Sequence, residues 1–175
     1  MTRISGPAAV AARYRKAEQA RVKAGAAHRV DYFHQVDEGY SYLAAQMLER
    51  VAARYDIELH CHLVRGQEGK NAPEPELLAQ LARVDSHEIA PGYGLSFPNH
   101  PSAPAADLVE TAAQILAAQS RSDFPRAAVS VSEALWRDDA SAMTELATAL
   151  GTALPEVTTA QIAVSYTHLT LPTKA

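Results

Sequence analysis

Two acidic residues and a tyrosine stand close together in the stretch Asp37-Glu38-Gly39-Tyr40. Neighbouring carboxylates can do acid–base chemistry when one of them raises the pKa of the other. They could instead bind a cationic or hydroxyl-bearing partner. They could also only cap a helix, with Asp37 accepting a backbone N–H and Glu38 facing the positive end of the helix dipole. Glu38, Asp37 and Tyr40 are therefore the candidate catalytic residues, and the adjacent Ser41 is a candidate ligand-binding residue.

Three histidines and the single cysteine offer other chemistry. His60 and His62 share one face of a predicted strand and His34 ends the strand before it, so the three could bind a metal. Polar residues that alternate outward along an edge strand explain the same pattern, and we expect no metal site. Cys61 points to the opposite face, which favours a small buried residue over a redox thiol. One cysteine also leaves the chain without an internal disulfide or a CxxC redox pair.

A strand and a helix surround the acidic stretch. Residues 30–35 are rich in aromatic and β-branched types, which is typical of a strand. From Tyr40 onward apolar residues recur at helical spacing, so that one helix face should pack against the core. We predict that this face comprises Tyr40, Leu43, Ala44, Met47, Val51 and Tyr55. On this pattern Tyr40 points into the core and Ser41 toward solvent, which weighs against a site role for either.

A second strand is predicted over residues 57–64, where apolar and polar residues alternate. Two short strands joined by one helix form a crossover, so the strands should be parallel. The rest of the chain has helical character. Helices are predicted over residues 7–27, 74–90, 104–120, 124–137 and 139–151. The pattern indicates an α/β protein in which a large helical block follows a βαβ unit.

Composition and charge narrow the class of protein. The chain has 175 residues, of which 47% are hydrophobic and 21% charged, as in a globular domain. No apolar run has the roughly 18 residues of a membrane helix, and a lone cysteine fits a reducing, cytoplasmic setting. Residues 1–29 carry a net charge of +6, and because the whole chain carries −4 the remainder carries −10. We interpret this basic segment as a solvated helix and do not expect a nucleic-acid or membrane partner.

Three local patterns, in a fixed order, resemble one family. VDYFHQVDEGYSYLAAQ (residues 30–46) is similar to its strand-and-helix pattern (F/Y)D-x-x-SPYS-(Y/W)-L. Residues 66–73, GQEGKNAP, are similar to a G…GN-x-PP loop, and residues 85–97, DSHEIAPGYGLSF, to D-x-x-x-x-A-x-x-x-GL-x-F. The chain thus resembles the DsbA-like thioredoxin-fold superfamily, nearest the branch of 2-hydroxychromene-2-carboxylate isomerases and kappa-class glutathione transferases. The resemblance implies a thioredoxin-like βαβ motif with a large helical insertion.

The resemblance also implies a chemistry that this chain does not fully carry. Members use a CxxC, or a serine in SPYS that favours the glutathione thiolate, at the start of the helix. That serine falls on Glu38 and the proline on Gly39. At 4 Å and an effective dielectric constant near 20, two like charges repel by about 4 kcal/mol, so a carboxylate would oppose a thiolate there. Asn71 matches an asparagine that helps to hold glutathione, and we take it as a candidate ligand-binding residue.

The last residues read as a different kind of sequence. The stretch VSYTHLTLPT, residues 164–173, matches the translation of a transposase-type sequencing adapter over ten consecutive residues. We therefore expect the native sequence to be cut near Ala163, before the C-terminal ββα of a thioredoxin fold. The expected organisation is a basic helix (1–29), the N-terminal half of the fold (30–73), a helical insertion (74–163) and a non-native tail (164–175).

Two functions follow from these observations. By resemblance the chain is a thiol- or glutathione-linked oxidoreductase or isomerase acting on a small molecule, with glutathione as a ligand. The alternative is a non-catalytic thioredoxin-fold binding module, because the redox cysteines and the family serine are both replaced.

Overall fold

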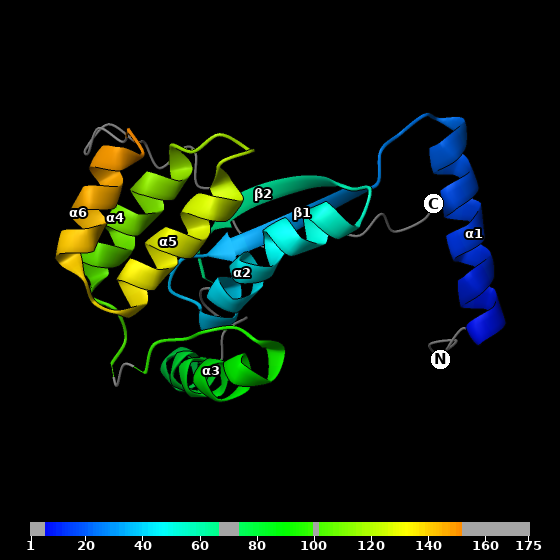
Figure 1. The fold of residues 1–175 in the computed structure, drawn as a ribbon. Coiled ribbons are helices and arrows are strands. Elements are labelled where there is room, and N and C mark those ends of the chain that lie inside the picture. Colours follow the sequence, from blue (N-terminus) through cyan, green and yellow to red (C-terminus); the bar gives the residue numbers. More distant parts are fainter. Residues whose placement is uncertain (1–5, 67–73, 100–101, 152–175) are drawn as a thin grey trace.

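The computed structural model describes residues 6–66, 74–99 and 102–151. Within these residues the sheet has two strands, β1 (Arg29–Gln35) and β2 (Glu58–Val64), joined by α2 (Gly39–Arg54). The strands are parallel, and Tyr32 pairs with Cys61 and His34 with Leu63. The predicted parallel crossover is confirmed. It delivers the chain from the end of β1 directly to the first turn of α2 (Figure 1).

The other helices lie close to their predicted spans. They are α1 (Pro7–Lys23), α3 (Pro75–Ile89), the 3-10 helix η2 (Ala90–Tyr93), α4 (Ala106–Ala117), α5 (Phe124–Trp136) and α6 (Ala140–Ala149). Local signals set several ends. Proline occupies the first turn of α1, α3 and α5, where its missing N–H costs nothing. The side chain of Asp139 caps α6 by accepting from the N–H of Ala142 at 2.9 Å.

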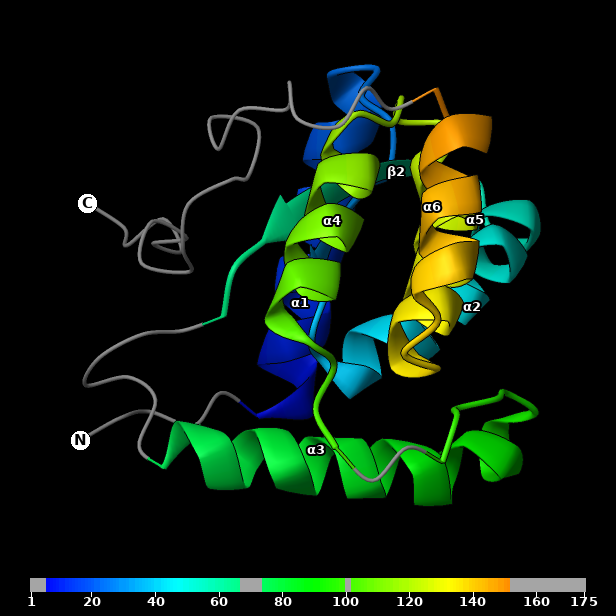
Figure 2. The same ribbon diagram turned by 90° about the vertical axis from the view of Figure 1, so that its left-hand side faces the viewer.

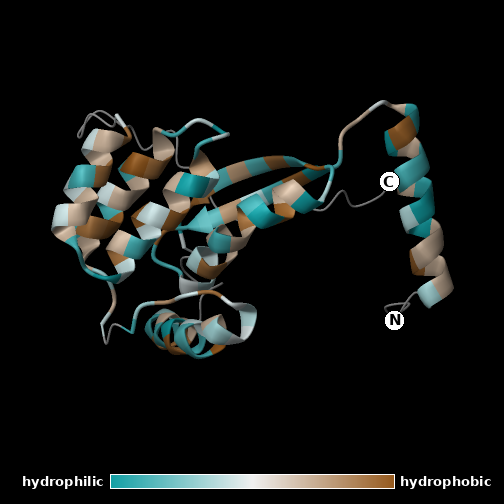
Figure 3. Cartoon of the chain, viewed as in Figure 1, coloured by the Kyte–Doolittle hydropathy of each residue, from teal (hydrophilic) through white to brown (hydrophobic). Residues whose placement is uncertain are grey.

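The main core lies between the sheet and the helical block. α5 crosses its centre, and its fully buried Val131 and Leu135 meet Ile115 of α4 and Met143 of α6. Leu63 of β2 joins the same cluster, so the βαβ unit and the helices share one apolar interior. Hydrophobic residues occur on the strands and on α4, α5 and α6, where these elements pack together (Figure 3). Burial of this surface is the main force that holds the strands to the helices.

A second, smaller cluster fixes α3 and the segment after it. Tyr42 and Leu43 of α2 pack with Ala90, Phe97 and Trp136. The rings of Phe97 and Trp136 lie 4.9 Å apart between centroids. Figure 2 shows α3 running crosswise below the other helices. This cluster therefore attaches α3 to the N-terminal half of α2.

The buried face of α2 differs from the predicted face. Buried positions are Gly39, Ser41, Tyr42, Leu43, Ala45 and Leu48. Tyr40 and Tyr55 are instead 43% and 56% exposed, and Ser41, expected in solvent, is 8% exposed. The prediction was wrong at these positions because α2 packs against α3, α5 and β1 together, and these neighbours bury small and polar residues of its first turn.

The N-terminal helix stands apart from this core. α1 has no buried residue along Pro7–Lys23, and Figure 1 shows it away from the sheet and the helical block. None of the described helices combines the length and the apolar content that crossing a bilayer requires. The structure thus has a packed βαβ-plus-helices body and one helix that adds nothing to its interior.

Candidate functional site

Glu38 is the N-cap of α2, and its carboxylate is fully engaged there. Oε1 accepts from the backbone N–H of Tyr40 at 3.1 Å, and Oε2 accepts from the N–H of Ser41 at 2.6 Å. These are two of the amides that a helix N-terminus leaves without an intrahelical partner. The negative charge also faces the positive end of the helix dipole. The acidic stretch therefore does cap the helix, but the capping residue is Glu38.

Asp37 does not cap the helix, contrary to the sequence-based assignment. Its Oδ1 accepts from the side-chain N–H of Gln35 at 3.0 Å, on the surface. The backbone explains the exchange of roles, since Glu38 has the extended φ and ψ of an N-cap residue, −116° and 121°, and follows Asp37 by one position. Asp37 and Glu38 thus bond different groups, one on β1 and one on α2.

Tyr40 projects from the first turn of α2 and bonds a residue of α3. Its hydroxyl donates to Oδ2 of Asp85 at 2.6 Å. This hydrogen bond, with smaller contributions from burial and from the charges of Asp85 and Glu38, raises the pKa of Tyr40 to about 12. The phenol therefore keeps its proton at neutral pH and can act as a hydrogen-bond donor rather than a base. Asp85 was not among the residues selected from the sequence, although it opens the third segment of the resemblance.

Ser41 links the start of α2 to β1 from within. Its Oγ accepts from the backbone N–H of Gln35 at 3.3 Å, and its carbonyl oxygen accepts from the hydroxyl of Tyr32 at 2.7 Å. Ser41 is buried, so these bonds position the helix on the strand rather than reach a ligand. The ligand-binding role of Ser41 stays a prediction, and the structure shows that its side chain is engaged inside the protein.

His34 completes the buried network under α2. Its Nδ1 lies 2.8 Å from the hydroxyl of Tyr32. That hydroxyl has one proton and gives it to the carbonyl of Ser41, so the Nδ1 of His34 must be the donor. Nε2 then carries a lone pair, and among the described residues it has no hydrogen-bond partner. Burial lowers the pKa of His34 to about 4, so the ring is neutral at neutral pH.

Gly39 allows the first turn of α2 to touch α3. A Cβ at this position would lie 2.5 Å from the Oγ of Ser86, 3.0 Å from its Cβ and 3.3 Å from Cε2 of Phe97. Ser86 is completely buried, and its hydroxyl has no partner among the described residues. The glycine that stands where the family pattern has proline is therefore required by a close helix–helix contact. Its departure from the pattern was the sequence signal for this contact.

Cys61 and the two neighbouring histidines do not join this site. Cys61 packs against the main core, and burial raises its pKa to about 11, which suppresses the thiolate. On the other face of the sheet His60 bonds Glu58 at 2.7 Å and His62 bonds Asp31 at 2.7 Å. His34 lies on the core-facing side, away from both, and among the described residues no group of three or more His, Cys, Asp or Glu side chains could hold a metal.

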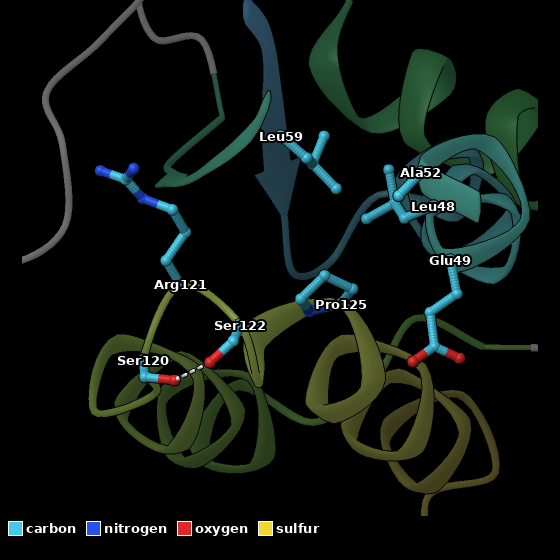
Figure 4. Close-up of a pocket in the computed structure, with 8 residues that line it drawn as sticks. All are labelled: Leu48, Glu49, Ala52, Leu59, Ser120, Arg121, Ser122 and Pro125. Atoms are coloured by element: carbon cyan, nitrogen blue, oxygen red, sulfur yellow. Dashed lines mark hydrogen bonds between the residues drawn. The ribbon is translucent and has the colours of Figure 1, made fainter. Parts of the chain in front are cut away.

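Asn71, the remaining candidate, lies outside the described residues, so its role as a ligand-binding residue stays a prediction. A pocket with a volume of about 690 Å³ lies at the other end of α2. It is lined by Leu48, Glu49, Ala52, Leu59, Ser120, Arg121, Ser122 and Pro125 (Figure 4). Arg121 at its rim pairs with Glu58 at 3.1 Å. This pocket contains none of the residues selected from the sequence.

Comparison of the chain with protein-family models, with well-characterised protein sequences and with solved structures finds no match. The chemistry of the site therefore rests on its own geometry. Of the candidates, Glu38 and Tyr40 lie together at the start of α2, with Asp37 just before them and Asp85 added from α3. Their hydrogen bonds engage both oxygens of Glu38 and the proton of Tyr40.

Proposed function

We propose that this chain is a thioredoxin-like module of the DsbA-like superfamily that binds a ligand without catalysing a thiol reaction. The parallel β1–α2–β2 crossover followed by a helical block supports the kinship. The observation that carries the absence of catalysis is the carboxylate of Glu38, whose two oxygens accept the N–H groups of Tyr40 and Ser41. In the resembling enzymes a thiolate is stabilised at this helix end. Here the protein's own anion already takes up the free amides.

The surface around this helix end favours a ligand with a positive charge. Asp37 and Asp85 are exposed carboxylates, and Tyr40 offers a phenol that is 43% exposed. A guanidinium or ammonium group can bond carboxylates and lie against an aromatic face. An anionic ligand such as glutathione would meet like charges instead. The proposed ligand is therefore a cationic small molecule or peptide group.

The test is an NMR titration of the ¹⁵N-labelled full chain with reduced glutathione and, separately, with spermidine. We expect spermidine to shift the amides of Tyr40 and Ser41, and glutathione at millimolar concentration to leave them in place. Tyr40→Ala, which removes the aromatic face, should weaken the spermidine response, while Tyr55→Ala, at an exposed position at the other end of α2, should not. Glu38→Ser should gain glutathione binding, because the serine still caps the helix and the carboxylate at the helix end itself is removed.

Two results would overturn the proposal. One is glutathione binding by the wild-type chain at the α2 N-terminus. The other is disulfide exchange or isomerase turnover that Glu38→Gln abolishes while the fold stays intact. Either result would favour an enzyme of the kind that the chain resembles. The second would identify Glu38 as an acid–base residue.

A further inference from the structure

α3 exposes an apolar row to solvent. Leu77, Leu81 and Val84 follow one another at spacings of four and three residues, and each is between 51% and 55% exposed. This row lies on the opposite side of the helix from the buried Ser86, which faces α2. At the next position of the same spacing stands Glu88, also exposed. Four consecutive positions of one helix face thus read apolar, apolar, apolar, acidic.

α1 carries a row with the same spacing and the opposite charge at its end. Val10, Tyr14, Ala17 and Arg21 are separated by four, three and four residues, as are the row positions of α3. Tyr14 is 73% exposed, and no residue of α1 is buried. Most helices in proteins owe their stability to the packing of an apolar face, and α1 packs no such face within the described residues. α1 therefore has the form of a helix whose packing partner is elsewhere.

The net charges of the two helices are complementary. α1 has five Arg and Lys residues and one Glu, a net of +4. α3 with its N-cap Glu74 has four acidic residues and one Arg, a net of −3. Opposite charges of this kind fix the orientation of two docking helices and increase their rate of association.

We propose that α1 of one copy of this chain docks on α3 of a second copy, with the two helices parallel. The pairs would be Val10 with Leu77, Tyr14 with Leu81, Ala17 with Val84 and Arg21 with Glu88. An antiparallel arrangement would set Arg21 against Leu77 and Glu88 against Val10, and so bury two unpaired charges. Arg21 already bonds Glu18 of its own helix at 2.7 Å, but a guanidinium has enough donors for a second carboxylate.

The segment between α1 and β1, residues 24–28, is too short for α1 to reach α3 of its own chain, which favours docking on a second copy. α1 ends at Lys23 and β1 begins at Arg29, so the link between them, fully extended, spans about 20 Å. α3 packs against Gly39, at the far end of β1, and the seven residues of β1 already take up about 20 Å. The linker would also have to pass around α3, which is about 10 Å thick, to place α1 on the apolar row. It is too short to do so within one chain. Two copies that exchange α1 helices satisfy both contacts by two-fold symmetry.

The test is the oligomeric state of the full chain, measured by light scattering after size-exclusion chromatography and by sedimentation over a concentration series. The wild type should dimerise. Arg21→Glu and Glu88→Arg should each raise the dimer dissociation constant by about tenfold or more, and the double variant should recover most of the loss. Leu81→Asp should give a monomer. Lys16→Glu and Glu76→Arg are matched controls, because they make the same charge changes away from the two rows.

A wild-type chain that stays monomeric at about 100 µM would overturn the proposal. So would single reversals that match their controls, or a double reversal that recovers nothing. Circular dichroism of each variant separates dimer loss from unfolding. Arg21 and Glu88 both lie on the surface outside the two apolar clusters, so their reversal should leave the helical signal of the body intact. The proposal does not depend on the ligand proposed for the α2 N-terminus.

Discussion

α1 and α2 are helices of nearly equal length, with 17 and 16 residues, and they differ in almost everything else. α2 begins with a side-chain cap from Glu38, buries six residues and touches β1, α3 and α5. α1 begins at Pro7 after the N-cap Gly6, has no side-chain cap bond and buries no residue. Local sequence is sufficient to predict both helices. Only packing against neighbours distinguishes the helix that stabilises the body from the one that is free to meet another molecule.

The largest expected difference between the two helices is in stability. Leu43 of α2 is buried in the second apolar cluster, so Leu43→Ala should lower the free energy of unfolding by about 2–5 kcal/mol. Val22 of α1 is 61% exposed, and Val22→Ala should change the free energy of unfolding by less than about 0.5 kcal/mol. Urea denaturation of both variants measures the contrast. Equal losses would show that α1 packs on the body after all.

The second prediction concerns pH and the network that ties α2 to β1. Burial lowers the pKa of His34 from 6.5 to about 4, so the unfolded chain binds a proton more readily than the folded one. Above pH 6.5 His34 is neutral in both states and costs no stability. As the pH falls toward 4, protonation of the unfolded chain lowers the free energy of unfolding, by about 3 kcal/mol in all. His34→Asn should remove most of this slope, because an amide can still donate to Tyr32 but does not titrate.

The matched control for the pH prediction is His28→Asn. His28 follows α1 and faces Glu18 at 3.6 Å on the surface. Its replacement should leave the acid dependence of unfolding as it is in the wild type. If both variants keep the wild-type slope from pH 6.5 to 4, the buried histidine does not control acid stability, and water reaches the network under α2.

The third prediction tests the contact between α2 and α3. Gly39→Ala should lower the free energy of unfolding by about 1–2 kcal/mol. The Oγ of Ser86 could turn away, but its Cβ and the ring of Phe97 stay within 3.3 Å of the new methyl group. Gly92→Ala is the control, because a Cβ there meets nothing within 4 Å. Thermal unfolding of Gly39→Ala combined with Ser86→Gly should show partial recovery, and a neutral Gly39→Ala would mean that the helices can separate at small cost.

The smallest expected effect is at the cap itself. Glu38→Gln keeps an oxygen for one amide but removes the charge at the helix dipole, so stability should fall by a few tenths to about 1 kcal/mol. Asp139→Asn, at the cap of α6, should have a similar effect. Stability and spermidine binding are measured together. Loss of stability alone identifies Glu38 as a helix-end charge, whereas loss of an activity at unchanged stability restores the catalytic hypothesis.

Much of the fold could be predicted from the sequence because its signals are local. The crossover was predicted from the alternation of apolar and polar residues over 57–64 and from the helical spacing after Tyr40. Proline and aspartate residues indicated where helices begin. The candidate site was harder to predict. The stretch from Asp37 to Tyr40 was correctly placed at the start of α2, but Asp37 was wrongly expected to cap it, Tyr40 to face the core and Ser41 to face solvent. Each role depends on a neighbour from β1 or α3 that periodicity in α2 does not reveal.

The sequence by itself determined that a βαβ unit precedes a helical block, that an acidic stretch begins the central helix, and that no redox pair of cysteines is present. The tertiary structure decided that Glu38 caps α2, that Tyr40 points outward to Asp85, and that His34 is buried with one ring nitrogen unpartnered among the described residues. The physical reason is the range of the interactions. Propensity, capping and periodicity act within a few residues, whereas burial and hydrogen bonding between elements depend on how distant segments pack.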